Sequence, residues 1–348
     1  GRSRLTVERY HDDVDRLERG FAQVLGTGDP VLARVTPSAF TDVASWLRDA
    51  PHERGHRRGY ARLTVGRTVG TWAAVLGYAE REWGIPSVWR RLDDRDRALL
   101  LDVRAPRKRG WFSDDEMGKL LALGRDPDVA MVLTMIWSGL RPGEARGLLR
   151  SQVDLDTGRV VVSWQLPQRP AVSGRTSEEG ETWRRVVVGG REFVLVPPKH
   201  GSTGVLYLPG RCLDLLRGLP RPLTREDHFV LSPAGTGLPY SRDQQEAAFR
   251  RVLMAADLAT THYLKDCRHT AATLLRKADV QEYIASRILR HSTQETARQA
   301  GSRLPARMTD TYGGLDASEV ELKEAARKLD ALFPAASRGG REAGEGEA

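Results

Sequence analysis

Apolar side chains recur at helical spacing throughout residues 31–103. One helix is predicted to begin after Thr36, a candidate N-cap that is followed by Pro37 at the first helical position. The pattern then predicts one long helix, or two that meet at a glycine, over residues 59–83, and a further helix after Pro86. Helices without strands predict a small helical bundle.

Both flanks of this bundle differ from it in composition. Residues 1–30 are mixed and charged, and we expect an N-terminal tail with at most a short helix over residues 14–25. The segment RAPRKRG, at residues 104–110, is strongly basic and is interrupted by proline. We interpret it as the linker between two domains, with cations that can follow a polyanion.

The chain beyond this linker mixes helical and strand patterns. Ser113 and Glu116 have the spacing of a capping box, which predicts the start of a helix. Residues 128–140 are nearly all apolar and predict a helix that is buried on all sides. Short runs rich in β-branched residues, bounded by turn residues, predict strands. These runs lie at residues 159–164, on both sides of Gly189 and Gly190, and at residues 204–209.

Helical patterns return towards the C-terminus. Ser241 is predicted to cap a helix that ends at Ala256, two helices are predicted over residues 262–290, and an amphipathic helix over residues 317–333. Residues 335–348 are small and polar and predict a disordered tail. The chain is therefore predicted to be a mainly helical α+β protein, whose second domain, at residues 111–334, carries a small antiparallel sheet.

Composition narrows the class of protein. Lys and Arg number 54 against 46 Asp and Glu, and the net charge of +8 makes a polyanionic partner plausible, although a soluble protein without such a partner can also be basic. The two cysteines have no metal-ligand spacing, which fits a reducing compartment. No run of about 18 apolar residues is present, and the first residues do not resemble a secretion signal. We expect a cytoplasmic protein.

Side chains that handle phosphate are concentrated in residues 262–312. They are Lys265, Arg268, His269, His291 and Tyr312. Cleavage of a phosphodiester by a protein nucleophile requires cations that neutralise the non-bridging oxygens, a hydroxyl nucleophile, and a proton donor for the leaving oxygen. A covalent intermediate conserves the bond for rejoining, so no cofactor is expected. The C-terminal domain can supply each of these groups.

Two motifs carry a family resemblance. The segment SGLRPGEARGLL, at residues 138–149, is similar to the first arginine box of the tyrosine recombinases, the integrase family. The segment KDCRHTAATLLRKADVQEYIASRILRHS, at residues 265–292, is similar to the second box, in which an H-x-x-R-H-T helix leads to an L-G-H-S turn and then to a tyrosine. The resemblance covers about residues 30–333. It implies a helical core-DNA-binding domain, a catalytic domain, and site-specific DNA recombination through a 3′-phosphotyrosyl intermediate.

The resemblance also implies a role for each matching residue. Two arginines, Arg141 and Arg268, would bind the scissile phosphate, and Glu144 would orient the first of them. Lys199 would be the general acid, and His291 would hydrogen-bond the phosphate. The remaining two are Tyr312, which would be the nucleophile, and His269, which would support the helix.

Three features depart from the family pattern. Lys265 stands where the family has a histidine, and helical spacing still directs it towards Arg268; His262, one turn earlier, is a candidate substitute. The 21-residue step from His291 to Tyr312 is long for the family, and the region before Lys199 is enlarged. The alternatives are a telomere resolvase, a type IB topoisomerase, and a DNA-binding relative that has lost catalysis.

The partners implied are double-stranded DNA and three further copies of the chain, because two recombining sites require four protomers. The final helix, at residues 317–333, could dock on a neighbouring subunit or pack on its own chain. Two basic clusters are predicted to contact the DNA backbone. They are Arg54, Arg57 and Arg58 in the first domain, and Arg104, Arg107, Lys108 and Arg109 in the linker. A solvated loop without DNA contacts is the alternative for the first cluster.

Overall fold

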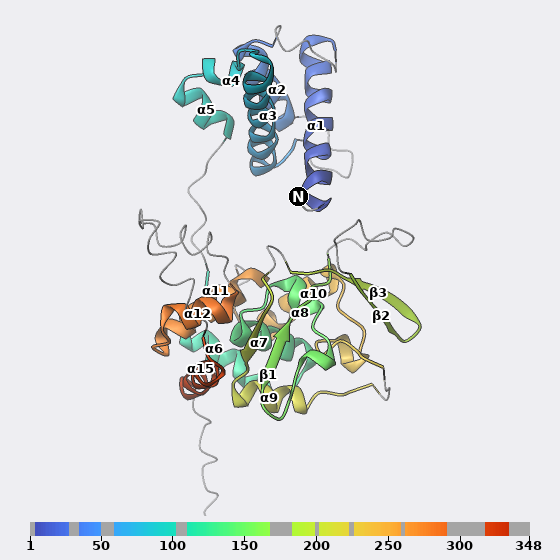
Figure 1. The fold of residues 1–348 in the computed structure, drawn as a ribbon, viewed down its shortest axis with the longest axis vertical. Helices are drawn as coiled ribbons and strands as arrows, with labels where there is room; N and C mark the ends of the chain where they lie inside the picture. Colours follow the sequence, from blue (N-terminus) through green and yellow to red (C-terminus); the bar gives the residue numbers. More distant parts are fainter. Residues whose placement is uncertain are drawn as a thin grey trace, which may run out of the picture. The chain divides into compact units, whose positions relative to one another are not determined.

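The computed structural model describes residues 4–27, 35–49, 59–101, 110–167, 183–198, 202–222, 226–258, 262–290 and 317–333 (Figure 1). The chain divides into two compact units, residues 1–108 and 109–348, each with its own hydrophobic core. Within the described ranges, no helix combines the length and the apolar character that crossing a membrane requires.

The first unit is a helical bundle, as its apolar spacing predicts. Its helices are α1 (Arg4–Leu25), α2 (Pro37–Asp49), α3 (Arg62–Trp83), α4 (Val88–Arg91) and α5 (Asp94–Leu101). The hydroxyl of Thr36 accepts a hydrogen bond from the backbone N–H of Ala39 at 3.1 Å, so the predicted cap of α2 is present. Helix α3 is a single helix that continues through its internal glycines.

Helix α1 corrects the expectation of an N-terminal tail. Leu17 and Phe21, one turn apart, are buried in the core of this unit. Asp13 is also fully buried, and it accepts hydrogen bonds from the hydroxyls of Thr68 and Thr71 on α3 at 2.9 and 3.0 Å. The charged composition of this segment hid a helix whose buried face includes a carboxylate.

The helix predicted after Pro86 is also corrected, because the segment forms two helices. Leu92 has an extended conformation that ends α4. The carboxylate of Asp93 then accepts a hydrogen bond from the backbone N–H of Asp96 at 2.6 Å and begins α5. The side chain therefore competes with the helix that the apolar pattern would otherwise continue.

The second unit is built around α7 (Figure 1). Its helices are α6 (Asp114–Ala122), α7 (Pro127–Ser138), α8 (Pro142–Arg146), α9 (Gly210–Arg217), α10 (Arg242–Ala255), α11 (Leu264–Lys277), α12 (Glu282–Leu289) and α15 (Glu319–Ala331), with 3₁₀ turns at Arg150–Gln152 and Pro233–Gly235. Every residue from Val129 to Ser138 is buried, because α9, α10 and α11 pack around α7. The predicted capping box of α6 is present, with hydrogen bonds of 3.2 and 2.7 Å between Ser113 and Glu116.

The predicted strands are present, but they form two small antiparallel sheets where one was expected. The strands are β1 (Arg159–Val162), β2 (Arg184–Val188), β3 (Arg191–Leu195) and β4 (Gly204–Tyr207), paired as β1–β4 and β2–β3. Gly189 and Gly190 form the tight turn of the β2–β3 hairpin, with φ of 56° and 74°. The hairpin packs on Leu149 and Phe229 and so has a small core of its own.

Helix α15 packs on its own chain. Four of its apolar residues are buried: Leu322, Ala325, Ala326 and Leu329. At its C-terminal end, the carboxylate of Asp330 accepts hydrogen bonds from the backbone N–H groups of Gly210 and Arg211, both at 3.2 Å. These contacts attach the helix to the start of α9, so packing in cis, one of the two predicted placements, is the one in this structure.

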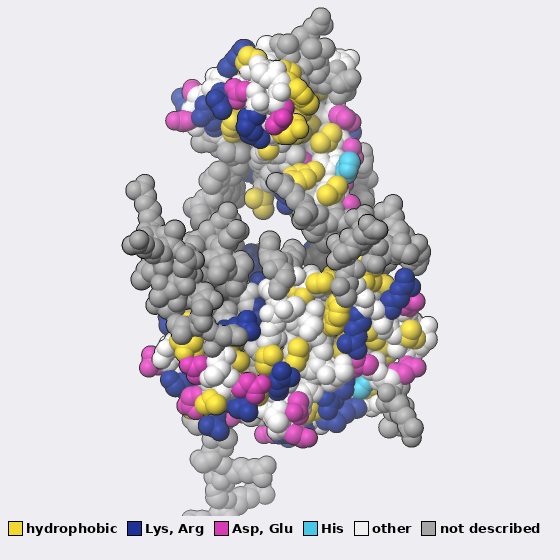
Figure 2. Space-filling model, in the orientation of Figure 1, with side chains coloured by type: hydrophobic (Ala, Val, Ile, Leu, Met, Phe, Trp, Pro, Cys, Tyr) yellow, Lys and Arg dark blue, Asp and Glu magenta, His cyan; other side chains and the backbone are white. Residues whose placement is uncertain are grey.

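Charge is distributed evenly over the face of the molecule in Figure 2. Basic and acidic side chains are interspersed over the described residues of both units on this face. Many of the ion pairs join two residues of the same helix, such as Asp214 and Arg217 at 2.9 Å. The excess of positive charge is therefore not gathered into one patch on the described part of this face.

Candidate active site

The site begins at the turn between α7 and α8. Helix α7 ends at Gly139, whose φ of 61° lies in the left-handed region that glycine adopts without strain. A Cβ atom at this position would lie 2.5 Å from Cδ2 of Leu289. The end of α12 can approach this turn only because the residue is glycine. The turn places Arg141 immediately before α8.

Arg141 is held from two sides. Its Nη1 donates to Oε1 of Glu144 at 2.7 Å and to the hydroxyl of Ser202 at 2.9 Å. Its Nη2 donates to the backbone carbonyl of Arg290 at 3.4 Å. The backbone N–H of Arg141 donates to Oε2 of Glu144 at 2.9 Å, so the carboxylate fixes both the backbone and the side chain of this arginine.

A second cation reaches the same carboxylate. The side chain of Arg290 is 1% exposed, and its Nη2 donates to Oε2 of Glu144 at 2.8 Å and to the carbonyl of Gly139 at 3.4 Å. Its backbone has a φ of 51°, a left-handed conformation that costs a residue other than glycine about 1 kcal/mol. The buried ion pair therefore stabilises the C-terminal end of α12 in a conformation that the backbone alone disfavours.

Arg268, on α11, binds the backbone at the end of α7 and at the end of α12. Its Nη1 donates to the carbonyl of Gly139 at 2.6 Å, and its Nη2 donates to the carbonyl of Leu289. Arg268 and Arg141 thus bond to the successive carbonyls of Leu289 and Arg290. Two guanidinium groups held together in this way can neutralise the charge of one phosphate.

Lys265 and His269 lie on α11 on either side of Arg268. Lys265 is exposed, and its Nζ lies 5.8 Å from the centre of the Tyr263 ring. Among the described residues no carboxylate forms an ion pair with Lys265, so its charge is available to an anion. His269 is partly buried, and its backbone carbonyl accepts a hydrogen bond from the hydroxyl of Thr273 at 3.1 Å.

His262, the candidate substitute for the missing histidine, lies among carboxylates. Its ring stacks on Phe112 with the ring centres 4.2 Å apart, its Nε2 lies 3.0 Å from Oε1 of Glu116, and its Nδ1 lies 3.8 Å from Oδ2 of Asp266. These contacts join the starts of α6 and α11. The geometry therefore gives His262 a role in packing these two helices together.

Several predicted site residues lie outside the described part of the chain. Among the catalytic predictions these are Lys199, His291 and Tyr312. Among the predicted DNA contacts they are Arg54, Arg57, Arg58, Arg104, Arg107, Lys108 and Arg109. Their roles stay predictions. One described segment ends at Arg290, the residue before His291, and another begins at Ser202, three residues after Lys199.

Two residues of the site were missed by the sequence analysis. Ser202 is one polar residue in a glycine-rich segment, and nothing in the local pattern indicated its contact with Arg141. Arg290 carried a usable signal, because it occupies the glycine position of the L-G-H-S turn. A charged residue at a glycine position of a tight turn needs a partner, and Glu144 is that partner.

Glu144 is ionised at neutral pH. Its complete burial would raise the pKa of the carboxyl group, but the charge of Arg290 and the hydrogen bonds and charge of Arg141 hold the pKa below its ordinary value of 4.5. Burial lowers the pKa of the Arg290 guanidinium, which the charge of Glu144 opposes. A carboxyl group whose pKa is lower in the folded protein than in the unfolded protein stabilises the folded state at pH values above its pKa in the unfolded protein. This contribution is lost as the pH falls through its pKa in the folded protein.

The lowered pKa of Glu144 gives a pH-dependent prediction for the stability of the Glu144→Gln variant. At pH 7 we expect the variant to be about 3 kcal/mol less stable than the wild type, because Arg290 is left buried without a counter-charge. The difference should begin to shrink as the pH falls below the ordinary pKa of 4.5, and it should be lost as the pH falls through the lower pKa of the folded state, where the wild-type carboxyl group also becomes neutral. Urea unfolding at several pH values measures it, with Glu324→Gln on the exposed face of α15 as the control. A difference that does not change with pH would show that the Glu144 charge is not involved.

The described residues contain no group of three or more His, Cys, Asp or Glu side chains arranged to hold a metal ion.

Comparison with known proteins identifies the fold. No family model and no curated protein match the sequence. The structure of the Tn1549 transposon integrase in complex with transposon right-end DNA is similar, with 15% identity, a TM-score of 0.59 and 93% of each chain covered. A lambda integrase dimer bound to a COC′ core site has 14% identity and a TM-score of 0.54, with 92% of this chain and 94% of that chain covered. A lambda integrase tetramer bound to a Holliday junction has 14% identity and a TM-score of 0.53, with 84% and 73% covered.

The chain therefore has the fold of the tyrosine recombinases, a mainly helical architecture with small antiparallel sheets. The predicted resemblance and the predicted fold class are confirmed.

Proposed function

We propose that this protein is a site-specific DNA recombinase that cuts and rejoins DNA strands through a covalent tyrosine intermediate. The observation that carries the proposal is the convergence of Arg141 and Arg268 on successive carbonyls at the end of α12. These arginines are far apart in sequence, and the family order requires that they meet beside His291. The fold shared with the Tn1549 and lambda integrases supports the same conclusion.

The proposed reaction uses the phenol of Tyr312 as the nucleophile. Its oxygen attacks the phosphorus atom, the bond from phosphorus to the 5′ oxygen breaks, and a 3′-phosphotyrosyl bond forms. Arg141 and Arg268 neutralise the two non-bridging oxygens, and His291 donates a hydrogen bond to one of them. Lys199 donates a proton to the leaving 5′ oxygen, and the phenol proton passes to solvent.

Rejoining is the reverse reaction on the partner strand. A free 5′ hydroxyl attacks the phosphotyrosyl bond, and Tyr312 leaves as the phenol after it regains a proton. The number of phosphodiester bonds is unchanged, so the reaction consumes no high-energy cofactor. Lys265 would contact the phosphate as a fixed charge, because its ammonium group is exposed and its helix also carries Arg268.

DNA and further copies of this chain are the proposed partners. The lambda integrase is known as a dimer on a core site and as a tetramer on a Holliday junction. We infer a tetramer of the present chain on two DNA sites, held partly by basic residues that contact phosphates without reading bases. The proposed backbone contacts are Arg54, Arg57, Arg58, Arg104, Arg107, Lys108 and Arg109.

The test is covalent capture of DNA. The protein is incubated with a pool of duplexes that carry a randomised sequence and a nick near the centre, so that cleavage releases a short fragment and traps the intermediate. We expect a complex that survives detergent in the wild type and is absent in Tyr312→Phe, and sequencing of the trapped DNA identifies the target site. Binding by the wild type without a covalent complex would leave a DNA-binding protein without catalysis.

The same trapped site distinguishes recombination from hairpin formation. When the intact duplex is used, exchanged strands between two duplexes are the expected products. Covalently closed hairpin ends would identify a telomere resolvase, a class whose members can lack the histidine that Lys265 replaces.

A further inference from the structure

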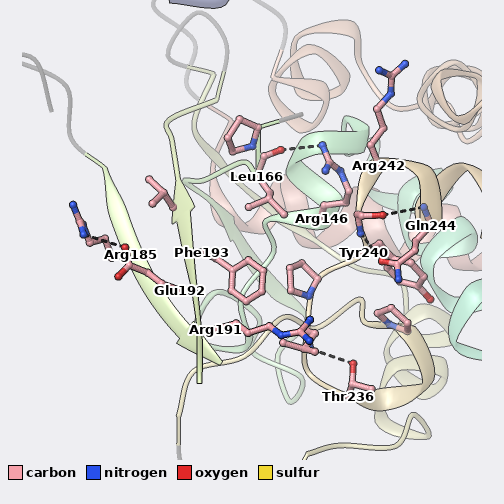
Figure 3. A pocket seen from close by; sticks show the side chains of 16 residues that line it. Arg146, Leu166, Arg185, Arg191, Glu192, Phe193, Thr236, Tyr240, Arg242 and Gln244 are labelled. Carbon is pink, nitrogen blue, oxygen red and sulfur yellow. Dashed lines mark hydrogen bonds and ion pairs between the residues drawn. The ribbon is translucent and has the colours of Figure 1, made fainter. Parts of the chain in front are cut away.

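A large pocket lies beside α8, on the second unit. It has a volume of about 1190 Å³ and is bounded by the end of α8, strand β3, the loop before α10 and the start of α10 (Figure 3). Its lining contains four arginines and one glutamate: Arg146, Arg185, Arg191, Arg242 and Glu192. The glutamate already pairs with Arg185 at 3.0 Å. The pocket therefore has more positive charge than its own residues neutralise.

Arg146 is the buried member of this set. It is 4% exposed, and its Nη2 donates to the carbonyl of Leu166 at 3.0 Å. Its Nε has no hydrogen-bond partner, and among the described residues no carboxylate forms an ion pair with it. Burial and the nearby charge of Arg242 lower the pKa of the Arg146 guanidinium. A buried guanidinium without a counter-charge is costly, which is consistent with a site that an anion completes.

Arg242 extends the site to the surface. It is exposed, and it is the first residue of α10, a helix of 14 residues whose N-terminus carries a partial positive charge. Arg242 also has no carboxylate partner within the described residues. Figure 3 shows it rising on the same side of the pocket as Arg146, whereas Arg185 and Glu192 lie on the hairpin across the pocket.

We propose that Arg146 and Arg242 bind one phosphate of the DNA backbone, separate from the phosphate that is cleaved. A planar guanidinium can give two parallel hydrogen bonds to a phosphate, and an exposed arginine at a helix N-terminus reinforces the same charge. This inference rests on the proposed function, because it takes DNA to be the anion.

The position of the pocket fits a contact that holds DNA against the active site. Arg141 lies immediately before α8 and Arg146 is the last residue of α8, so a rise of five residue steps, or roughly 7.5 Å, separates the two arginines along the helix axis. Gln245 on α10 also donates to the carbonyl of Pro142 at 3.2 Å, which ties the start of α10 to the start of α8. A phosphate held by Arg146 and Arg242 would therefore be fixed relative to Arg141.

The experiment measures how DNA affinity depends on salt. Each phosphate contact releases counter-ions, so the slope of log K against log salt changes by about 0.9 for each contact that is lost. We expect Arg242→Ala to make the slope of binding to a duplex oligonucleotide less steep by about 0.9, between about 50 and 200 mM KCl. Arg250→Ala, an exposed arginine on the same helix, is the matched control and should leave the slope unchanged.

Arg146 is tested in combination, because its replacement can affect folding. The Arg146→Met and Arg242→Ala substitutions together should reduce the slope no more than Arg242→Ala does alone, since both side chains bind one phosphate. Thermal unfolding of each variant establishes that it is folded. A slope equal to the wild-type slope in a folded Arg242→Ala variant would overturn the inference. The inference would also be overturned if the Arg146→Met substitution decreased the slope further in the double variant, by an amount that adds to the effect of Arg242→Ala.

Two further measurements separate the phosphate contact from the proposed function and from a small-anion site. Covalent capture with the wild type tests the proposed function alone. If the wild type forms the covalent complex but the Arg242→Ala variant has the wild-type salt slope, only the phosphate contact is rejected. Inorganic phosphate is the second probe, compared with chloride at equal ionic strength. An unchanged DNA slope, with phosphate stabilising the wild type but not Arg146→Met, would overturn the DNA contact in favour of a small-anion site.

Discussion

Replacement of Arg290 by alanine is expected to lower the free energy of unfolding by about 3–5 kcal/mol. Glu144 is fully buried, and the charge of Arg290 lowers the pKa of its carboxyl group more than any other single interaction does. The variant leaves the carboxylate with Arg141 alone. Arg290→Gly removes the same ion pair but relieves the left-handed backbone, so it should be about 1 kcal/mol more stable than Arg290→Ala. Urea unfolding at neutral pH measures both values.

The double replacement Glu144→Gln with Arg290→Met is the control for this prediction. Removing both charges avoids an unpaired buried ion, so most of the lost stability should return. The single variants Glu144→Gln and Arg290→Met should also form the covalent complex more slowly, because Arg290 fixes the chain just before His291. If the alanine variant is as stable as the wild type, the buried ion pair does not hold this turn.

Replacement of Arg268 by alanine is expected to slow covalent capture by about 10²–10³-fold. Arg268 would neutralise the phosphate in the transition state, and it also bonds to the carbonyls of Gly139 and Leu289. Arg268→Lys keeps the charge but lacks the planar guanidinium group that can bond to two carbonyls and a phosphate at once. We therefore expect it to recover only part of the rate. Single-turnover formation of the covalent complex gives the rates.

Arg276→Ala is the matched control, since Arg276 is an exposed arginine on the same helix. It should leave the rate unchanged. Equal slowing in the two alanine variants would mean that general positive charge on α11 matters, and not the position of Arg268.

Local signals in the sequence were sufficient where neighbouring residues decide the structure. The capping box of Ser113 and Glu116 and the Gly189–Gly190 hairpin are examples, and both were predicted correctly. Long-range partners decided the rest. The burial of Asp13 depends on Thr68 and Thr71, more than fifty residues away, which no local pattern reveals.

The candidate site shows the same division. The arginine boxes could be located because their motifs are local, and the structure brings Arg141, Glu144 and Arg268 together. Arg290 was missed because its partner Glu144 lies 146 positions earlier in the chain. The sequence analysis did not single out the residue before His291, and the ion pair of Arg290 with Glu144 became visible in three dimensions.

The most direct test of the proposed reaction is to find which atom carries the DNA. The trapped complex is digested with nuclease and protease, and the modified peptide is identified by mass spectrometry. We predict a nucleotide joined through its 3′ phosphate to the peptide that contains Tyr312, together with a released strand whose 5′ end is a hydroxyl that a kinase labels directly. A nucleotide on another residue, or a linkage through a 5′ phosphate, would contradict the account.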